Sequence, residues 1–140
     1  MTRDLLSPFL LIFSFISLFA QTPCANGNVD IPGGGNSNDY PCLGLTLQSY
    51  VDIEDMGDVN TGEAQDSWGW TDSQDGDEYA LVALDNGTAF INITNPVNPV
   101  YLLWLPSVTG TSVWRDLKFY QNHAYIVTDA NGDHGMQIFD

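Results

Sequence analysis

Short runs of apolar residues, separated by polar turn residues, recur along the second half of the chain. Several of them alternate with polar residues, and this two-residue period is typical of β-strands because every second side chain reaches the same sheet face. No amphipathic helix of useful length is expected after residue 20. The predicted strands are 67–71, 79–84, 88–94, 100–105, 113–120, 123–127 and 136–139.

The segments between these strands have the composition of turns. The Asn-Gly pair at 86–87 predicts a tight hairpin, since it tolerates the positive φ that a type I′ turn requires. Gln121 and Asn122 predict a second tight turn. Two prolines within 95–99 end the strand ladder there, because proline donates no backbone hydrogen bond.

The strand pattern repeats along the chain. Segment 78–82 aligns with 124–128, and 90–92 aligns with 138–140, so the offset is 46 to 48 residues. A four-stranded antiparallel unit that recurs every ~40–50 residues is typical of a β-propeller blade. We therefore predict an all-β fold, the N-terminal portion of a β-propeller, which is incomplete in this chain and so a fragment of a longer protein. A small β-sandwich complete in itself is the alternative.

The chain divides into three regions on this basis. Residues 66–140 hold about one and three-quarter blades. Residues 21–65 form an irregular acidic leader, in which 43–47 and 50–53 alternate like short strands. Residues 1–20 have the pattern of an export signal.

The export signal begins with a short polar region that contains Arg3, and an almost wholly apolar run follows. A membrane anchor is the alternative, but this run is shorter than the ~20 residues that span a bilayer, and polar residues follow at once. We expect cleavage after Ala20, a secreted or surface-displayed protein, and no insertion into the membrane after cleavage.

The chain contains two cysteines, Cys24 and Cys42. An even number of cysteines in an exported protein favours a disulfide. A metal or redox pair is the alternative, but the two residues lack the usual C-x-x-C spacing and have no histidine nearby. The predicted disulfide would close a flexible glycine-rich loop in the leader.

The charge of the chain excludes some partners. Eighteen acidic residues stand against three basic ones, for a net charge of -15. Such a surface repels phosphate backbones and anionic membranes, so we expect no nucleic-acid partner.

Residues 129–133 have the D-x-N-x-D spacing of a calcium loop, with Asp129, Asn131 and Asp133 as oxygen ligands. However, His134 stands where such a loop requires glycine. An ordinary turn is therefore the favoured interpretation, and calcium is the one cofactor that the sequence leaves open.

The tryptophans support two interpretations. Flat indole faces could form a carbohydrate platform, but tryptophans that alternate in strands are more often core residues between blades, and we favour the core. The four residues are Trp68, Trp70, Trp104 and Trp114.

The remaining candidates are a charged pair and two histidines. Arg115 and Asp116 are adjacent on one predicted strand, so their side chains point to opposite faces. We expect Arg115 to pair with a carboxylate on a neighbouring strand. His123 and His134 could be a metal pair or a catalytic base, but no nucleophile motif such as G-x-S-x-G accompanies them. They are therefore interpreted as hydrogen-bonded scaffold residues.

Several motifs are shared with a known family. They include Trp-Arg-Asp-Leu-Lys at 114–118 and Tyr-Ile-Val at 125–127. The others are 39–42 with Cys24 upstream, 68–72, 78–82, 87–88, 90–96 with Pro99 after it, 123–124 and 134–140. In these motifs the chain resembles the LVIVD-repeat proteins, specifically the secreted "choice-of-anchor B" group, which is bacterial in character. The resemblance implies an exported β-propeller with a C-terminal sorting signal and no established reaction.

Together these patterns favour a non-enzymatic interaction scaffold, secreted or displayed on the cell surface, whose partner is an extracellular protein or glycan. The alternative hypothesis is a fragment of an extracellular hydrolase that acts on polysaccharide or peptide.

Overall fold

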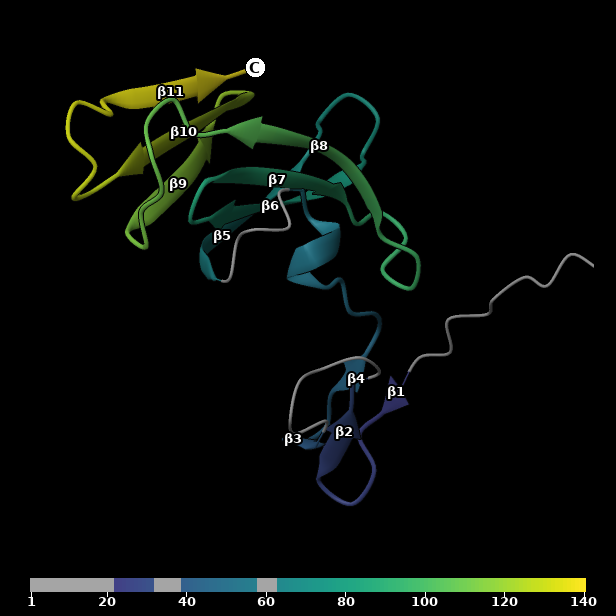
Figure 1. The fold of residues 1–140 in the computed structure, drawn as a ribbon. Coiled ribbons are helices and arrows are strands. Elements are labelled where there is room, and N and C mark those ends of the chain that lie inside the picture. Colours follow the sequence, from purple (N-terminus) through teal and green to yellow (C-terminus); the bar gives the residue numbers. More distant parts are fainter. Residues whose placement is uncertain (1–21, 32–38, 58–62) are drawn as a thin grey trace, which may run out of the picture.

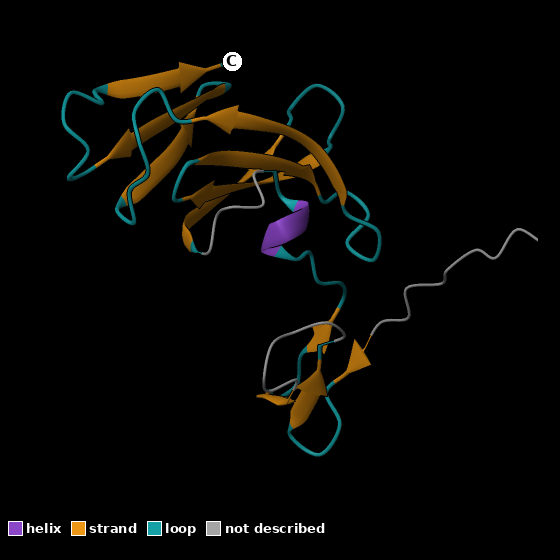
Figure 2. Cartoon of the chain, in the orientation of Figure 1, coloured by secondary structure: helices purple, strands orange, loops and turns teal. Residues whose placement is uncertain are grey.

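The computed structural model describes residues 22–31, 39–57 and 63–140, and their ordered elements are almost all antiparallel β-strands (Figures 1 and 2). The predicted export signal at 1–20 lies outside the described residues. The only helix in the described ranges is η1, a single 3-10 turn at Ile53–Asp55. No helix in those ranges is long and apolar enough to cross a membrane.

A small disulfide-bonded unit lies at the N-terminal end, apart from the larger sheets in Figure 1. Its four short strands pair as β1 with β4 and β2 with β3. The Cys24–Cys42 disulfide joins the two halves of this unit, with the Cα atoms 5.9 Å apart. The disulfide prediction is confirmed, and such bonds are typical of oxidising, extracellular compartments. The strands are β1 (Thr22–Pro23), β2 (Asn28–Asp30), β3 (Asp39–Pro41) and β4 (Thr46–Leu47).

The leader forms less strand than its alternation predicts. In segment 43–47 only Thr46–Leu47 is a strand, and Leu43 and Leu45 are exposed because no sheet packs against them. Segment 50–53 is not a strand: it leads into η1, where Asp52 caps the first turn by accepting a hydrogen bond from the Glu54 amide at 3.3 Å.

The first large sheet has four strands in the order β5-β6-β7-β8, each antiparallel to the next. Every one was predicted, although β5 begins three residues earlier than its apolar pattern and contains a register shift between Ala64 and Asp66. The strands are β5 (Ala64–Thr71), β6 (Glu78–Leu84), β7 (Gly87–Asn92) and β8 (Val100–Pro106).

The second sheet has three strands in the order β11-β10-β9, again joined in succession. They are β9 (Arg115–Tyr120), β10 (His123–Thr128) and β11 (Met136–Phe139). The predicted strand 113–120 loses its first two residues, because the Trp114 amide donates to the Ser112 hydroxyl at 3.1 Å and belongs to a loop. The all-β, antiparallel prediction is confirmed, while the two sheets do not close into a ring within the described residues.

The predicted tight turns at 85–87 and 121–122 differ from each other in their backbone angles. Asp85 and Asn86 form the predicted two-residue connection between β6 and β7, but neither has positive φ, so the type I′ assignment is wrong there. Their carbonyl groups instead accept tertiary hydrogen bonds, from the Ser112 amide at 2.7 Å and the Ser107 amide at 2.8 Å. Positive φ is found in the other turn, at Gln121 (48°) and Asn122 (62°).

Gly87 is required by packing rather than by its φ angle. A Cβ atom there would lie 2.7 Å from Trp104 Cε2 and 2.5 Å from the Leu105 carbonyl oxygen. The Trp104 ring also lies against Gly57, where an added Cβ would be 2.6 Å from Cε3. The Trp104 side chain is therefore held between two glycines on the β7–β8 side of the sheet.

We expect the Gly87→Ala variant to be destabilised by about 1–3 kcal/mol, because backbone and a large ring must move to admit the methyl group. Gly69→Ala is the matched control, since it is also in a strand and no atom lies within 4 Å of its added Cβ. Thermal unfolding followed by circular dichroism compares the two. Equal melting temperatures for both variants would contradict the packing around Trp104.

The core lies between the two sheets. Buried Leu81 and Ala83 of β6 face buried Leu117 of β9 and Ala124 and Ile126 of β10. The β5 and β9 strands are also joined where the Leu117 amide donates to the Asp66 carboxylate at 3.0 Å.

Aromatic rings close the edges of this core. The Trp70 ring stacks on Tyr79, with centroids 4.9 Å apart, and on Phe119, with centroids 4.4 Å apart. Phe90 of β7 meets Phe139 of β11 at 5.0 Å. The two sheets are therefore held by contacts that cross from one to the other on both sides of the core.

Candidate functional site

Three connections meet at one end of the two sheets, at the left of the sheets in Figure 2, and we call this end the loop face. They are the β6–β7 turn (85–86), the β8–β9 loop (107–114) and the β10–β11 loop (129–135). Ser112 joins all three: its amide donates to the Asp85 carbonyl and its hydroxyl to the Asp129 carbonyl, both at 2.7 Å. The buried Ser112 side chain thus fixes the loops relative to one another.

Further hydrogen bonds hold the β8–β9 loop against the β10–β11 loop. Thr109 Oγ1 lies 2.7 Å from His134 Nδ1, and the Asn131 side-chain amide donates to the Gly110 carbonyl. The Trp114 carbonyl accepts from the Asp129 amide at 2.9 Å. These bonds replace the missing strand ladder, so the loop face has a defined backbone without regular secondary structure.

Arg115 lies beneath the loop face and is only 2% exposed. Its Nε donates to the Leu84 carbonyl at 2.9 Å, and its Nη2 donates to the Asp85 carbonyl at 3.3 Å. We expected a carboxylate partner, and this was wrong, because the hydrogen-bond acceptors are backbone carbonyls at the end of β6. Burial lowers the pKa of Arg115, and the negative charge of Asp85 opposes that shift.

The side chain next to Arg115 points the other way, as predicted. Asp116 is exposed and accepts from Lys118 Nζ at 3.3 Å, while Lys118 also reaches Asp66 at 3.4 Å. Partial burial raises the pKa of Asp66, but hydrogen bonds with the Leu117 amide, the Asp116 carboxyl group and the Ser67 amide, together with the Lys118 charge, lower it overall.

Three buried polar atoms of the loop face have no protein hydrogen-bond partner among the described residues. They are Asp85 Oδ1, Arg115 Nη1 and His134 Nε2. Buried polar atoms in folded proteins are nearly always hydrogen-bonded, to protein, water or a ligand. The loop face therefore has unused acceptor and donor capacity.

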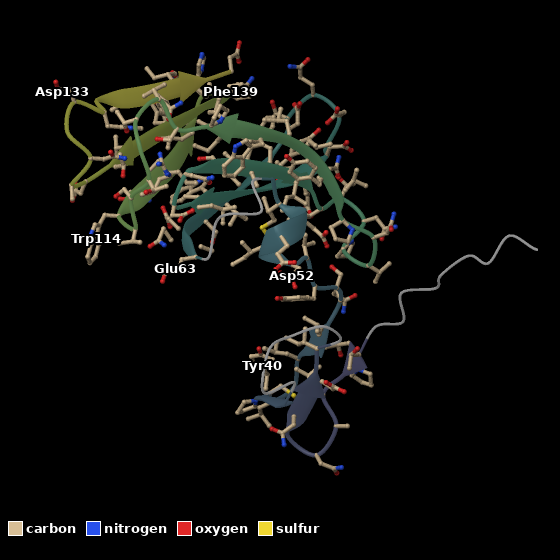
Figure 3. All side chains as sticks on the ribbon, viewed as in Figure 1. Tyr40, Asp52, Glu63, Trp114, Asp133 and Phe139 are labelled. Carbon is tan, nitrogen blue, oxygen red and sulfur yellow. A yellow bond between two sulfur atoms is a disulfide. The ribbon has the colours of Figure 1, made fainter. Side chains whose placement is uncertain are left out.

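An open pocket of about 300 Å³ lies on the loop face. All three connections contribute to it, and the Trp114 side chain that lines it is 66% exposed. Figure 3 shows the Trp114 side chain pointing away from the strands. The lining residues are Asp85, Thr111, Ser112, Val113, Trp114 and Ala130.

The tryptophans divide between the two roles that the sequence left open. Trp70 and Trp104 are both partly buried, and Trp70 packs against the core, as expected for packing residues. Trp68 is 38% exposed and lies under Lys118 Nζ, which is 4.8 Å from the ring centroid. The core prediction is wrong for Trp114, which stands in solvent beside the pocket.

The structure does not bring the two histidines together. His123 begins β10 and its Nδ1 lies 2.7 Å from the Gln121 carbonyl, whereas His134 is in the loop that follows the other end of β10. Each ring contacts neighbouring loop residues, as predicted for scaffold histidines.

The candidate calcium residues lie in the β10–β11 loop. Asp129 and Asp133 are exposed, and the Asn131 amide is directed to the Gly110 carbonyl. Among the described residues, no three His, Cys, Asp or Glu side chains gather in a way that could hold a metal ion. Calcium binding by these residues remains a prediction from the sequence.

Comparison with known proteins gives no match: no family model, curated protein or solved structure is significantly similar to the chain.

We expect the loop face to lose stability in mild acid because of His134. Burial and the Arg115 charge both lower the pKa of His134 below its usual 6.5. The unfolded chain then takes up a proton at higher pH than the folded one. The contribution of neutral His134 to the free energy of unfolding is therefore complete above about pH 6.5, and it declines as the pH falls through that value.

Melting temperatures of the wild type and His134→Gln, measured between about pH 7.5 and 5.5, test this pH dependence. On acidification, the melting temperature of the wild type should fall further than that of His134→Gln. His123→Gln is the control, since it lies away from Arg115 and should behave like the wild type. Parallel curves for the wild type and His134→Gln would contradict the role of His134.

Proposed function

We propose that this chain is part of a secreted or surface-displayed β-propeller that binds an extracellular protein or glycan at its loop face, without catalysing a reaction. The observation that carries the proposal is the exposed Trp114 ring, which lies beside a pocket to which three loops contribute. Rigid, exposed aromatic side chains next to a pocket are typical of binding sites.

The sheet order supports the propeller part of this proposal. The strands β5–β8 follow one another as in a blade, and β9–β11 begin the same order again. The segments that repeat in the sequence are in equivalent strands, 78–82 in β6 and 124–128 in β10.

The repeat also relates a packed surface to an exposed one. Phe90, which packs in the core between the sheets, aligns with Ile138, which is 59% exposed on β11. Met136, on the same strand and the same face, is also exposed. An apolar outer face on the second sheet is expected if a further sheet packs against it, as blades do in a propeller.

Three observations support the location. The Cys24–Cys42 disulfide is typical of an oxidising compartment. The predicted export signal at 1–20 and the resemblance to LVIVD-repeat proteins both imply export. We propose secretion or surface display on these grounds.

The loop-face proposal is tested by retention on extracellular material. The purified mature protein is mixed with cell-envelope, extracellular polysaccharide and secreted-protein fractions, and the bound share is measured by sedimentation or pull-down. We expect binding that falls at least about tenfold in Trp114→Ala. It should not fall in Trp68→Ala, which removes a partly exposed indole from strand β5.

The same mixtures are assayed for new reducing ends and new amino termini. No turnover is expected. Release of sugar or peptide products by the wild type would favour the alternative, a hydrolase, and binding that does not depend on Trp114 would contradict the loop face as the binding surface.

A further inference from the structure

We infer that the loop-face pocket binds one uncharged sugar residue of a glycan, with the ring stacked on Trp114 and a hydroxyl donated to Asp85. This inference rests on the proposed function and names the class of ligand.

The Trp114 ring extends from a backbone segment that hydrogen bonds hold in place. The Trp114 amide donates to Ser112 Oγ at 3.1 Å, and its carbonyl accepts from the Asp129 amide at 2.9 Å and from Thr128 Oγ1 at 3.2 Å. The backbone under the ring is thus fixed before any ligand arrives. An exposed flat aromatic ring suits the C–H face of a pyranose, and the loop backbone that carries it needs little further ordering on binding.

The pocket offers hydrogen-bonding groups to a ligand. The Asp85 carboxylate lines the pocket. An ionised carboxylate accepts hydrogen bonds on both of its oxygens, so the part of this group that faces the pocket can accept from a ligand hydroxyl. Thr111 also lines the pocket and offers a hydroxyl that can donate or accept. Sugar hydroxyls match both groups.

Charge also favours a neutral ligand. Among the described residues, Asp85 is the one charged side chain that lines the pocket, and the positive charge of Arg115, which donates to the Asp85 carbonyl, offsets it. An anionic ligand is disfavoured by the net charge of -15 over the whole chain. The polar groups of the pocket therefore favour an uncharged ligand that both donates and accepts hydrogen bonds.

The pocket is small. A volume of about 300 Å³ is at the lower end of the range for small-molecule pockets, ~300–1,000 Å³. The pocket is open to solvent, so one sugar unit can occupy it while the remainder of a glycan extends away.

The experiment is a calorimetric titration of the mature full chain with neutral oligosaccharides: gluco-, manno-, xylo- and N-acetylchito-oligosaccharides. Oligogalacturonate and a lysine oligopeptide are the charged probes. We expect at least one neutral oligosaccharide to bind, with affinity at least about tenfold lower in Trp114→Ala and within about threefold of wild type in Trp114→Phe, because a ring remains. Trp68→Ala should bind as the wild type does.

Failure of every neutral oligosaccharide, preference for a charged probe, or unchanged affinity in Trp114→Ala would overturn the inference. The result also separates the two proposals. If retention on extracellular material depends on Trp114 but no oligosaccharide binds, the sugar inference is wrong and the loop-face proposal stands. If retention does not depend on Trp114, both are wrong.

Discussion

Arg115→Ala should lower the free energy of unfolding by about 2–4 kcal/mol. The variant removes two hydrogen bonds from a charged donor and leaves the carbonyl groups of Leu84 and Asp85 without that partner. It also leaves the Asp85 carboxylate, which has a buried oxygen, without the nearby positive charge. Because Arg115 connects the start of β9 to the end of β6, the loss should weaken the contact between the two sheets.

The midpoint of urea unfolding is measured for Arg115→Ala and compared with that for Lys118→Ala. Lys118 is the other basic residue in the described ranges, and its ion pairs with Asp66 and Asp116 are exposed to solvent. Exposed pairs contribute little to stability, so Lys118→Ala should unfold close to the wild-type midpoint. An Arg115→Ala midpoint equal to that of Lys118→Ala would show that the buried guanidinium does not hold the loop face.

Leu81→Ala should cost about 2–5 kcal/mol, because Leu81 is fully buried between the two sheets and the truncated side chain leaves a cavity. Leu102→Ala is the matched control, since the same atoms are removed from a side chain that is 47% exposed on β8. Its effect should be much smaller.

A double-mutant cycle with Ile126→Ala tests whether Leu81 stabilises the contact between sheets or only its own sheet. Leu81 is on β6, and Ile126 is on β10 of the second sheet. The two residues belong to one buried cluster, so their effects should be coupled by about 0.5 kcal/mol or more. Strict additivity would contradict direct packing of one sheet on the other.

The strands of the two large sheets could be predicted because their information is local. Within each sheet, every strand pairs with its neighbour along the chain, so the two-residue alternation and the intervening turn residues are sufficient. The leader was over-predicted for the same reason. Leu43 and Leu45 alternate like strand residues, but alternation forms a strand only where another surface covers the apolar face.

The candidate site could be predicted only in part. Trp70 and Trp114 both occur in alternating segments, and only the packing of the second sheet on the first distinguishes the buried ring from the exposed one. The roles of Asp85 and Ser112 had no signal in the sequence, because they depend on loops that are distant along the chain. The partners of Arg115 are backbone carbonyls, which every residue possesses and no side-chain pattern can indicate.

The measurement that tests the loop face most directly is a nuclear magnetic resonance titration that follows the indole N–H signals of Trp68, Trp70, Trp104 and Trp114. The ligand is the soluble form of whichever extracellular material retains the protein. We predict that the Trp114 signal shifts most and that the core signal of Trp70 changes least. A largest shift at Trp68 or Trp104, with Trp114 unchanged, would contradict the loop face as the binding surface.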